Sequence, residues 1–218
     1  MRWWIGPLTL VTLVAVGISI GAWRDKTHSS NQSHTAAQPF NPIQAGTYLT
    51  EPKPLPPFHL MASDGKPFTE DDLKNYWSFV FFGYTRCPEL CPKTLGVMQQ
   101  LAEQLGPHSS TRFVLVSIDP EHDTPNYLKQ YFNAPPYHAL PFRGATGERT
   151  ELSKLTNILG LYLQEGHVPF NGHLEHSGAL LLINPQGEFT ALFNNPDNPD
   201  QIARDFQRVM QLYVHSTS

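Results

Sequence analysis

Two cysteines are the residues in this sequence whose type and spacing could do chemistry. Cys87 and Cys91 are the two cysteines of the 218 residues, and three residues separate them. In a helical turn this spacing places both side chains on one face, where both sulfurs could bind one metal ion. Two thiolates leave a copper or zinc ion incompletely coordinated, so a metal site would need a third ligand from elsewhere in the chain.

Thiol–disulfide exchange is the second chemistry open to these cysteines. Oxidoreductases of this kind typically carry two residues between their cysteines rather than three. Amides at a helix N-terminus and the neighbouring Arg86 would favour the thiolate over the thiol, which helps both redox attack and metal binding. A structural disulfide and two inert buried thiols are the alternatives without chemistry.

The segments around the cysteines predict alternating strands and helices. Apolar runs predict strands over 77–83, 112–119, 179–183 and 188–193, the last two joined by an Asn-Pro-Gln-Gly turn. Apolar spacing and cap residues predict helices over 94–105, from Thr124 onward, over 148–159 and over 199–213. A further hairpin is expected near 58–67, with Thr69 capping a short helical turn after it. This order indicates an α/β protein with a thioredoxin-like fold and an N-terminal β-hairpin extension.

Histidine is the natural candidate for a third metal ligand. His173 and His176 lie just before the strand predicted over 179–183, in a loop that this fold should place near the cysteine turn. Either imidazole could bind the ion, and their positions alone do not choose between them. Six other histidines have no motif around them and are expected to be surface or structural residues: His28, His34, His59, His108, His138 and His215.

The N-terminal residues predict a membrane anchor. The uncharged stretch from Trp3 to Trp23 would span about 30 Å as a helix, which is the thickness of the hydrocarbon core of a bilayer. A single transmembrane helix is therefore expected within residues 1–26, with a cleaved signal peptide as the competing interpretation. Residues 27–57 are polar and rich in proline, which predicts a flexible linker. Residues 58–218 are expected to form the folded domain.

Composition excludes some classes of function. The chain has 15 basic and 19 acidic residues, a formal net charge of −4, so it offers no general basic surface to phosphates. No nucleic-acid partner is expected. With 40% hydrophobic residues, the length suits one ordinary domain plus the N-terminal segments rather than a two-domain enzyme.

Four motifs occur in the order seen in one known family. They are FFGYTRCPELCPKTL at 81–95, VSIDPEHDTP at 116–125, GATG at 144–147 and LEHSGALLLINPQGEF at 174–189. Together they resemble the Sco/SenC proteins, which are membrane-tethered copper proteins with a thioredoxin fold that deliver copper to cytochrome c oxidase. The resemblance covers residues 57–214.

The resemblance implies a specific set of copper ligands. Cys87, Cys91 and His176 would bind one copper ion, a donor set that suits Cu(I) and still tolerates Cu(II). This implication favours His176 over His173. Glu175 stands where the family usually has aspartate, so the outer contacts of the imidazole can differ slightly.

The acidic segment after the strand predicted over 112–119 is assigned two roles. The resemblance implies that Asp119 lies close to the cysteines and tunes the site from outside the ligand set. Glu121, Asp123 and Thr124 are expected to cap the helix that follows.

The resemblance also implies a function and its partners. The main hypothesis is a copper chaperone that passes the ion to the copper-bearing subunit of cytochrome c oxidase, at a bacterial inner membrane with the domain facing the periplasm or cell exterior. Another copper chaperone as donor and a thioredoxin-like reductant are further expected partners, because both thiols must stay reduced. The alternative is enzymatic: a thiol–disulfide reductase that acts on the oxidase cysteines or on another partner. A peroxide reductase is disfavoured by the second cysteine and the histidine.

Overall fold

One mixed sheet with helices around it forms the described part of the chain, which in this computed structural model comprises residues 41–106, 109–138, 141–159 and 178–216. The sheet order is β1-β8-β7-β4-β5-β6-β2-β3. Its strands are β1 (Thr47–Pro54), β2 (Leu60–Ala62), β3 (Pro67–Phe68), β4 (Trp77–Gly83), β5 (Thr111–Ser117), β6 (Phe142–Thr146), β7 (Leu180–Ile183) and β8 (Glu188–Phe193). The helices are the short 3-10 helix η1 (Glu70–Leu73), α2 (Leu90–Leu105), α3 (Pro125–Asn133), α4 (Arg149–Ile158) and α5 (Pro199–Ser216).

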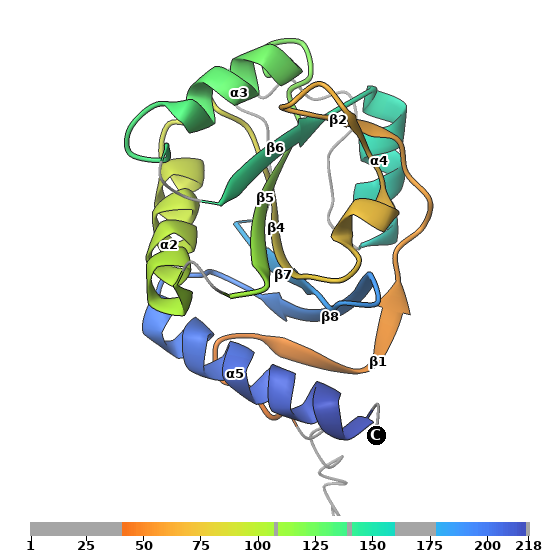
Figure 1. The fold of residues 1–218 in the computed structure, drawn as a ribbon, viewed down its shortest axis with the longest axis vertical. Helices are drawn as coiled ribbons and strands as arrows, with labels where there is room; N and C mark the ends of the chain where they lie inside the picture. The colour runs from red at the N-terminus through yellow and green to blue at the C-terminus, as the bar shows by residue number, and fades with distance from the viewer. Residues whose placement is uncertain (1–40, 107–108, 139–140, 160–177, 217–218) are drawn as a thin grey trace, which may run out of the picture. The chain divides into compact units, whose positions relative to one another are not determined.

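Strand β4 lies in the middle of the sheet, and all seven of its residues are buried. It pairs in parallel with β5 and antiparallel with β7, and β5 continues in parallel to β6. Figure 1 shows α2 and α4 on opposite sides of these strands. Because side chains alternate along a strand, both faces of β4 must be apolar, which its continuous apolar run provides.

The two faces of β4 pack against different helices. On one face the ring of Phe79 meets Phe206 of α5 edge to face, with centroids 5.2 Å apart. On the other face Val80 and Phe82 surround a small apolar cavity together with Leu155 of α4. Burial on both sides fixes the position of β4 and therefore of the residues that follow it.

Most predicted elements are confirmed. Strands β4 and β8 have the predicted bounds, and α3 begins after the predicted Thr124 cap, whose hydroxyl accepts a hydrogen bond from the Tyr127 amide at 3.2 Å. The N-terminal hairpin is present as β2 and β3, and Thr69 precedes η1 as expected. The mixed α/β class is therefore confirmed. Helix α2 differs, because it begins at Leu90, four residues before the predicted start.

Strand β1 lies within the range expected to be a flexible linker, 27–57. It pairs antiparallel with β8 at the edge of the sheet, with an irregular register between Tyr48 and Lys53. Two prolines are tolerated there because an edge strand has one unpaired side. The segment before β1 is also held, since the buried carboxylate of Asp205 in α5 accepts hydrogen bonds from the amides of Gln44 and Ala45 at 2.9 and 2.6 Å.

Within the described ranges, no helix is both long enough and apolar enough to cross a membrane. Residues 1–26, where the anchor is expected, and residues 27–40 of the expected linker lie outside those ranges.

The aromatic contact between β4 and α5 predicts a stability effect. Phe206 is 1% exposed, so Phe206→Ala should lower the free energy of unfolding by about 3–5 kcal/mol, through lost burial and the cavity that remains. The matched control is Val214→Ala in the same helix, where the side chain is 58% exposed and the change should stay within about 0.5 kcal/mol. Urea unfolding followed by circular dichroism measures both. Equal effects of the two substitutions would contradict this packing.

Candidate metal centre

Both cysteines lie where β4 ends and α2 begins. Cys87 is in the loop between the two elements, and Cys91 is the second residue of α2. Both are free thiols, and they are 7% and 1% exposed. The early start of α2 matters here, because it places Cys91 in the first helical turn rather than in the loop.

Backbone amides fix the two sulfurs. The amide of Cys91 donates to Sγ of Cys87 at 3.3 Å, and the amide of Tyr84 donates to Sγ of Cys91 at 3.5 Å. The amide of Cys87 donates in turn to the carbonyl of Tyr84 at 3.3 Å, which closes a tight turn. Both sulfurs therefore lie in the same turn, although Cys87 itself precedes the helix and is not part of the helical i, i+4 pair that the spacing predicted.

The state of the Cys91 thiol differs from the prediction. Burial raises the pKa of Cys91 well above its usual range. The expectation that the helix N-terminus and Arg86 would favour its thiolate is therefore wrong for Cys91. The Arg86 guanidinium forms an ion pair with the Asp119 carboxylate instead.

Gly83, the last residue of β4, leaves room for the Cys91 sulfur. A Cβ at this position would lie 2.8 Å from Sγ of Cys91 and 2.7 Å from the ring of Phe81. Both distances are too short for any side chain, so glycine is required for the close approach of α2 to the strand end.

Asp119 lies beside the cysteine loop, as the resemblance implied. It is 3% exposed, and its carboxylate accepts a hydrogen bond from Arg86 Nη2 at 2.8 Å. His122 Nδ1 lies 2.9 Å from the other carboxylate oxygen and 2.7 Å from Arg86 Nη2. Burial opposes ionisation of Asp119, but the hydrogen bonds from His122 and Arg86 hold its pKa below the usual range.

Asp123 has a role that the sequence analysis missed. Its buried carboxylate accepts hydrogen bonds from the Thr85 amide at 2.9 Å, from the Thr85 hydroxyl and from the Ser117 hydroxyl at 2.6 Å. The expectation that Asp123 caps α3 is therefore wrong, and Thr124 alone fills that role. Glu121 does not cap the helix either, because it forms an ion pair with Arg149 at 2.8 Å.

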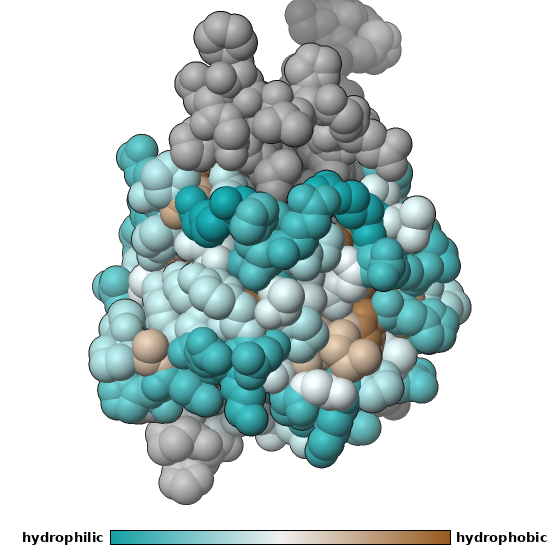
Figure 2. Space-filling model, turned by 90° about the horizontal axis from the view of Figure 1, so that it is seen from above, coloured by the Kyte–Doolittle hydropathy of each residue, from teal (hydrophilic) through white to brown (hydrophobic). Residues whose placement is uncertain are grey.

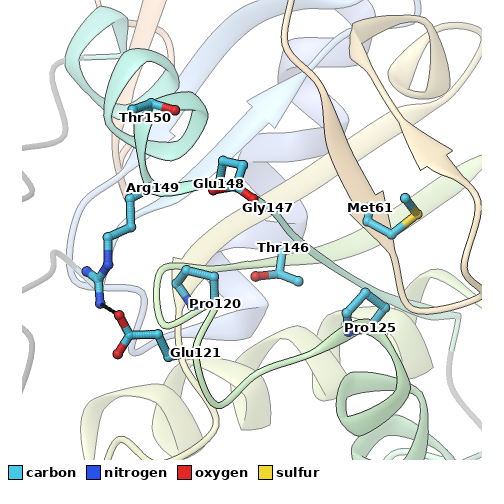
Figure 3. Close-up of a pocket in the computed structure, with 9 residues that line it drawn as sticks. All are labelled: Met61, Pro120, Glu121, Pro125, Thr146, Gly147, Glu148, Arg149 and Thr150. Carbon is cyan, nitrogen blue, oxygen red and sulfur yellow. Dashed lines mark hydrogen bonds and ion pairs between the residues drawn. The ribbon is translucent and has the colours of Figure 1, made fainter.

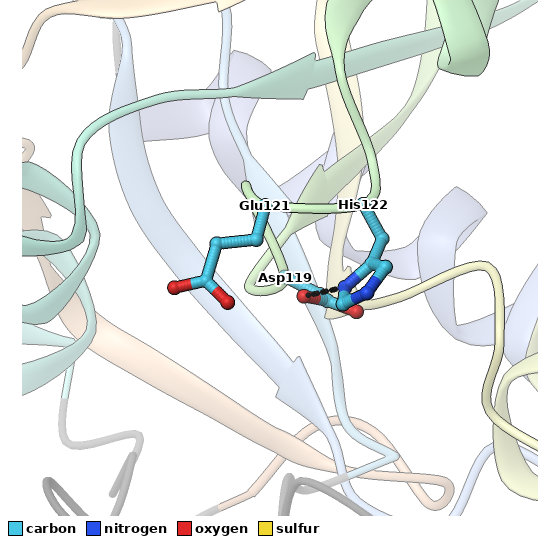
Figure 4. A group of neighbouring side chains, drawn as sticks. All are labelled: Asp119, Glu121 and His122. Atoms are coloured by element: carbon cyan, nitrogen blue, oxygen red, sulfur yellow. Dashed lines mark hydrogen bonds and ion pairs between the residues drawn. The ribbon is translucent and has the colours of Figure 1, made fainter.

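A second group of possible metal ligands lies in the same loop. Oxygen and nitrogen atoms of Asp119, Glu121 and His122 lie within 4.8 Å of one another (Figure 4). The Arg86 guanidinium already contacts two of these three side chains. A cation would have to displace it, so the sulfurs are the stronger candidate for a soft metal ion.

An open cleft of about 480 Å³ lies next to this group. Figure 3 shows the ion pair between Glu121 and Arg149 on one side of it and Met61 on the other. The hydroxyl of Thr146 is buried and has no hydrogen-bond partner among the described residues. Neither cysteine is among the residues that line the cleft.

The expected histidine ligand belongs to the segment before β7. His173, Glu175 and His176 lie outside the described residues. The chain is described again from Gly178, where a Cβ would lie only 2.9 Å from Cδ1 of Leu90, the residue before Cys91. The pairing of β7 with β4, in which Leu180 faces Phe81, brings this part of the chain to the cysteine end of β4.

The end of the molecule that carries α3 has a mostly hydrophilic surface among the described residues (Figure 2). Across all described residues, exposed large apolar side chains are few: Met61, Leu90, Tyr127 and Val214. Leu90 is 38% exposed and stands directly beside the buried thiols.

Comparison with known proteins identifies the family. The family model described as SCO1/SenC matches residues 48–211. This chain is 32% identical over 165 residues to a protein of Stutzerimonas stutzeri that is named as a copper-binding protein. The match covers 74% of this chain and 79% of that protein.

Two solved structures share the fold. Bradyrhizobium japonicum ScoI with copper bound superimposes with a TM-score of 0.60 at 27% identity, covering 72% of this chain and 99% of that one. BsSco, described as a member of the Sco family of cytochrome c oxidase assembly proteins with a disulfide switch, superimposes with a TM-score of 0.62 at 23% identity, covering 75% of this chain and 98% of that one. The match over most of the chain, together with the cysteine turn at the end of β4, shows that this chain belongs to the SCO1/SenC family.

Proposed function

We propose that this chain is a copper chaperone that binds one copper ion through Cys87, Cys91 and His176. The observation that carries the proposal is the pair of free, buried thiols held together by the hydrogen bond from the Cys91 amide to the Cys87 sulfur. Two thiols and one imidazole are soft and intermediate donors, which suit Cu(I) and tolerate Cu(II). The copper-bound Bradyrhizobium relative supports copper as the ion.

His176 is the proposed third ligand. It precedes Gly178 by two residues, and Gly178 packs against Leu90 at the first turn of α2. This closeness along the chain is what supports His176 as the third donor. His173 is five residues from Gly178, which makes it the less suitable donor. Glu175 and Asp119 are proposed to act outside the ligand set, Asp119 through its contact with Arg86.

In this proposal copper is the ion that the protein carries, and the Cys91 thiol loses or regains its proton as the ion binds or leaves. The Cys91 thiol is protonated in the metal-free chain because burial raises its pKa. Binding of copper therefore releases the Cys91 proton, and release of copper takes it back. Ligand exchange with cysteines of an acceptor moves the ion, and no bond in a substrate is broken.

The proposed acceptor is the copper-bearing subunit of cytochrome c oxidase. BsSco is described as belonging to a family of oxidase assembly proteins, which supports this choice. We also propose that residues 1–26 anchor the chain in a bacterial inner membrane, that residues 27–46 link the anchor to the sheet, and that the domain faces the periplasm or cell exterior. Another copper chaperone would supply the ion.

A thiol–disulfide reductase is the second candidate function. The Cys87 sulfur lies 3.3 Å from the backbone amide of Cys91, which supports the formation of a Cys87–Cys91 disulfide. In that reaction one thiolate attacks the partner's disulfide, the second displaces the mixed disulfide, and the partner leaves as a dithiol. A thioredoxin-like reductant must then return two electrons to the chain.

Copper affinity tests the ligand assignment. For the full chain in detergent, competition with a coloured Cu(I) chelator should give tight binding to the parent. Substitution of Cys87 or Cys91 by serine should weaken binding by about a hundredfold or more, and His176→Ala by about 10–100-fold, because each removes a donor atom. His173→Ala is the matched control and should bind like the parent. Parent-like binding by His176→Ala would remove that residue from the ligand set.

The reductase candidate makes its own prediction about which sulfur attacks. Cys91 is protonated and 1% exposed, so Cys87 should be the attacking thiol. With an oxidised peptide that carries the oxidase cysteine pair, Cys91→Ser should trap a mixed disulfide on Cys87, detectable by mass spectrometry. Cys87→Ser should trap none. A mixed disulfide trapped on Cys91 would reverse this assignment.

A further inference from the structure

We infer that Asp123 is a positioning residue for the metal centre, because its buried carboxylate holds Thr85, two residues before Cys87. The inference deepens the proposed copper function and rests on it. Asp123 is fully buried, and it follows Thr85 by 38 residues. The carboxylate therefore fastens the cysteine loop to a different part of the chain.

Thr85 is bound at two points by the same carboxylate. Its amide donates to Oδ2 of Asp123 at 2.9 Å, and its hydroxyl donates to Oδ1. These bonds fix both the backbone direction and the side-chain rotamer at Thr85. The loop has little freedom left, since the amide of Cys87 closes the turn onto the carbonyl of Tyr84 at 3.3 Å.

The neighbouring residue, Arg86, is held by the same loop. Asp119 accepts its hydrogen bonds, and the amide of Asp123 donates to the carbonyl of Asp119 at 2.8 Å. Ser117 links the carboxylate of Asp123 to the backbone of Asp119, because its hydroxyl donates to Asp123 at 2.6 Å and accepts from the amide of Asp119 at 3.1 Å. Two consecutive residues before Cys87 are thus each fastened by a carboxylate from the loop after β5.

The three hydrogen bonds at position 123 require a carboxylate side chain. Three donors converge on it: one amide and two hydroxyls. A carboxylate accepts from all three, whereas the amide of asparagine would point its own donors at one side of the group. A buried donor left without an acceptor is costly, so the loop would shift to relieve it. The shift would move the Cys87 sulfur relative to Cys91.

Thr85→Val tests the inference without removing the charge. Valine keeps the shape and the backbone amide but loses the hydroxyl bond to Asp123. The Cu(I) affinity of the full chain, measured by chelator competition, should fall about tenfold, as is typical when a group that orients a ligand is lost. Thr85→Ser keeps the hydroxyl and should restore parent affinity. Asp123→Asn should lower the Cu(I) affinity by about 10–100-fold.

Thr156→Val in α4 is the matched control. It removes a buried threonine hydroxyl, which donates to the carbonyl of Leu152 at 2.9 Å. This bond lies within α4 and involves no residue of the cysteine loop, so its loss should lower thermal stability and leave Cu(I) affinity unchanged. If Asp123→Asn does not fold, Thr85→Val and Thr85→Ser still decide the question.

The outcomes separate this inference from the proposed function. Tight copper binding by the parent with parent-like binding by Thr85→Val overturns the positioning role and leaves the chaperone proposal intact. Equal losses of affinity in Thr85→Val and Thr156→Val, or no restoration by serine at position 85, also overturn it, because they would indicate a general loss of stability. Failure of the parent to bind copper overturns both.

Discussion

The parallel pairing of β4 with β5 is the interaction on which the candidate metal centre depends. The two strands pair in register from Trp77 and Thr111 to Gly83 and Ser117, and one more hydrogen bond, from the amide of Ile118 to the carbonyl of Gly83 at 2.9 Å, continues the ladder. Because parallel strands end at the same edge of a sheet, the cysteine loop and the acidic loop leave side by side. Their contacts through Thr85 follow from that arrangement.

Burial raises the pKa of a carboxyl group and of a thiol alike, so the partners of each group decide the outcome. At Asp119 the hydrogen bonds from His122 and Arg86 outweigh burial and hold the pKa below its usual range. At Cys91 burial dominates and raises the pKa of the thiol. In the proposed copper site, an entering ion would therefore replace at least the Cys91 proton.

Local sequence patterns predicted the elements whose structure depends on local interactions. The apolar run of β4 and the Thr124 cap of α3 are examples. Strand β1 was missed because its sequence contains two prolines and charged residues, and its order comes from pairing with β8 far along the chain.

Asp123 was assigned to the nearest helix because a capping pattern is local, whereas its partner Thr85 lies 38 residues away. The contact of His122 with Arg86 was missed for the same reason. The cysteines were found because their spacing occurs at a strand-to-helix turn and in order with three further motifs. The third ligand stays a prediction, because His176 lies outside the described residues.

X-ray absorption at the copper edge of the Cu(I)-loaded full chain tests most directly whether the cysteine turn is a copper site. The account predicts two sulfur neighbours and one nitrogen neighbour, and loss of the sulfur signal when both cysteines are replaced by serine. A spectrum with nitrogen and oxygen neighbours alone, or one that the double substitution leaves unchanged, would contradict it.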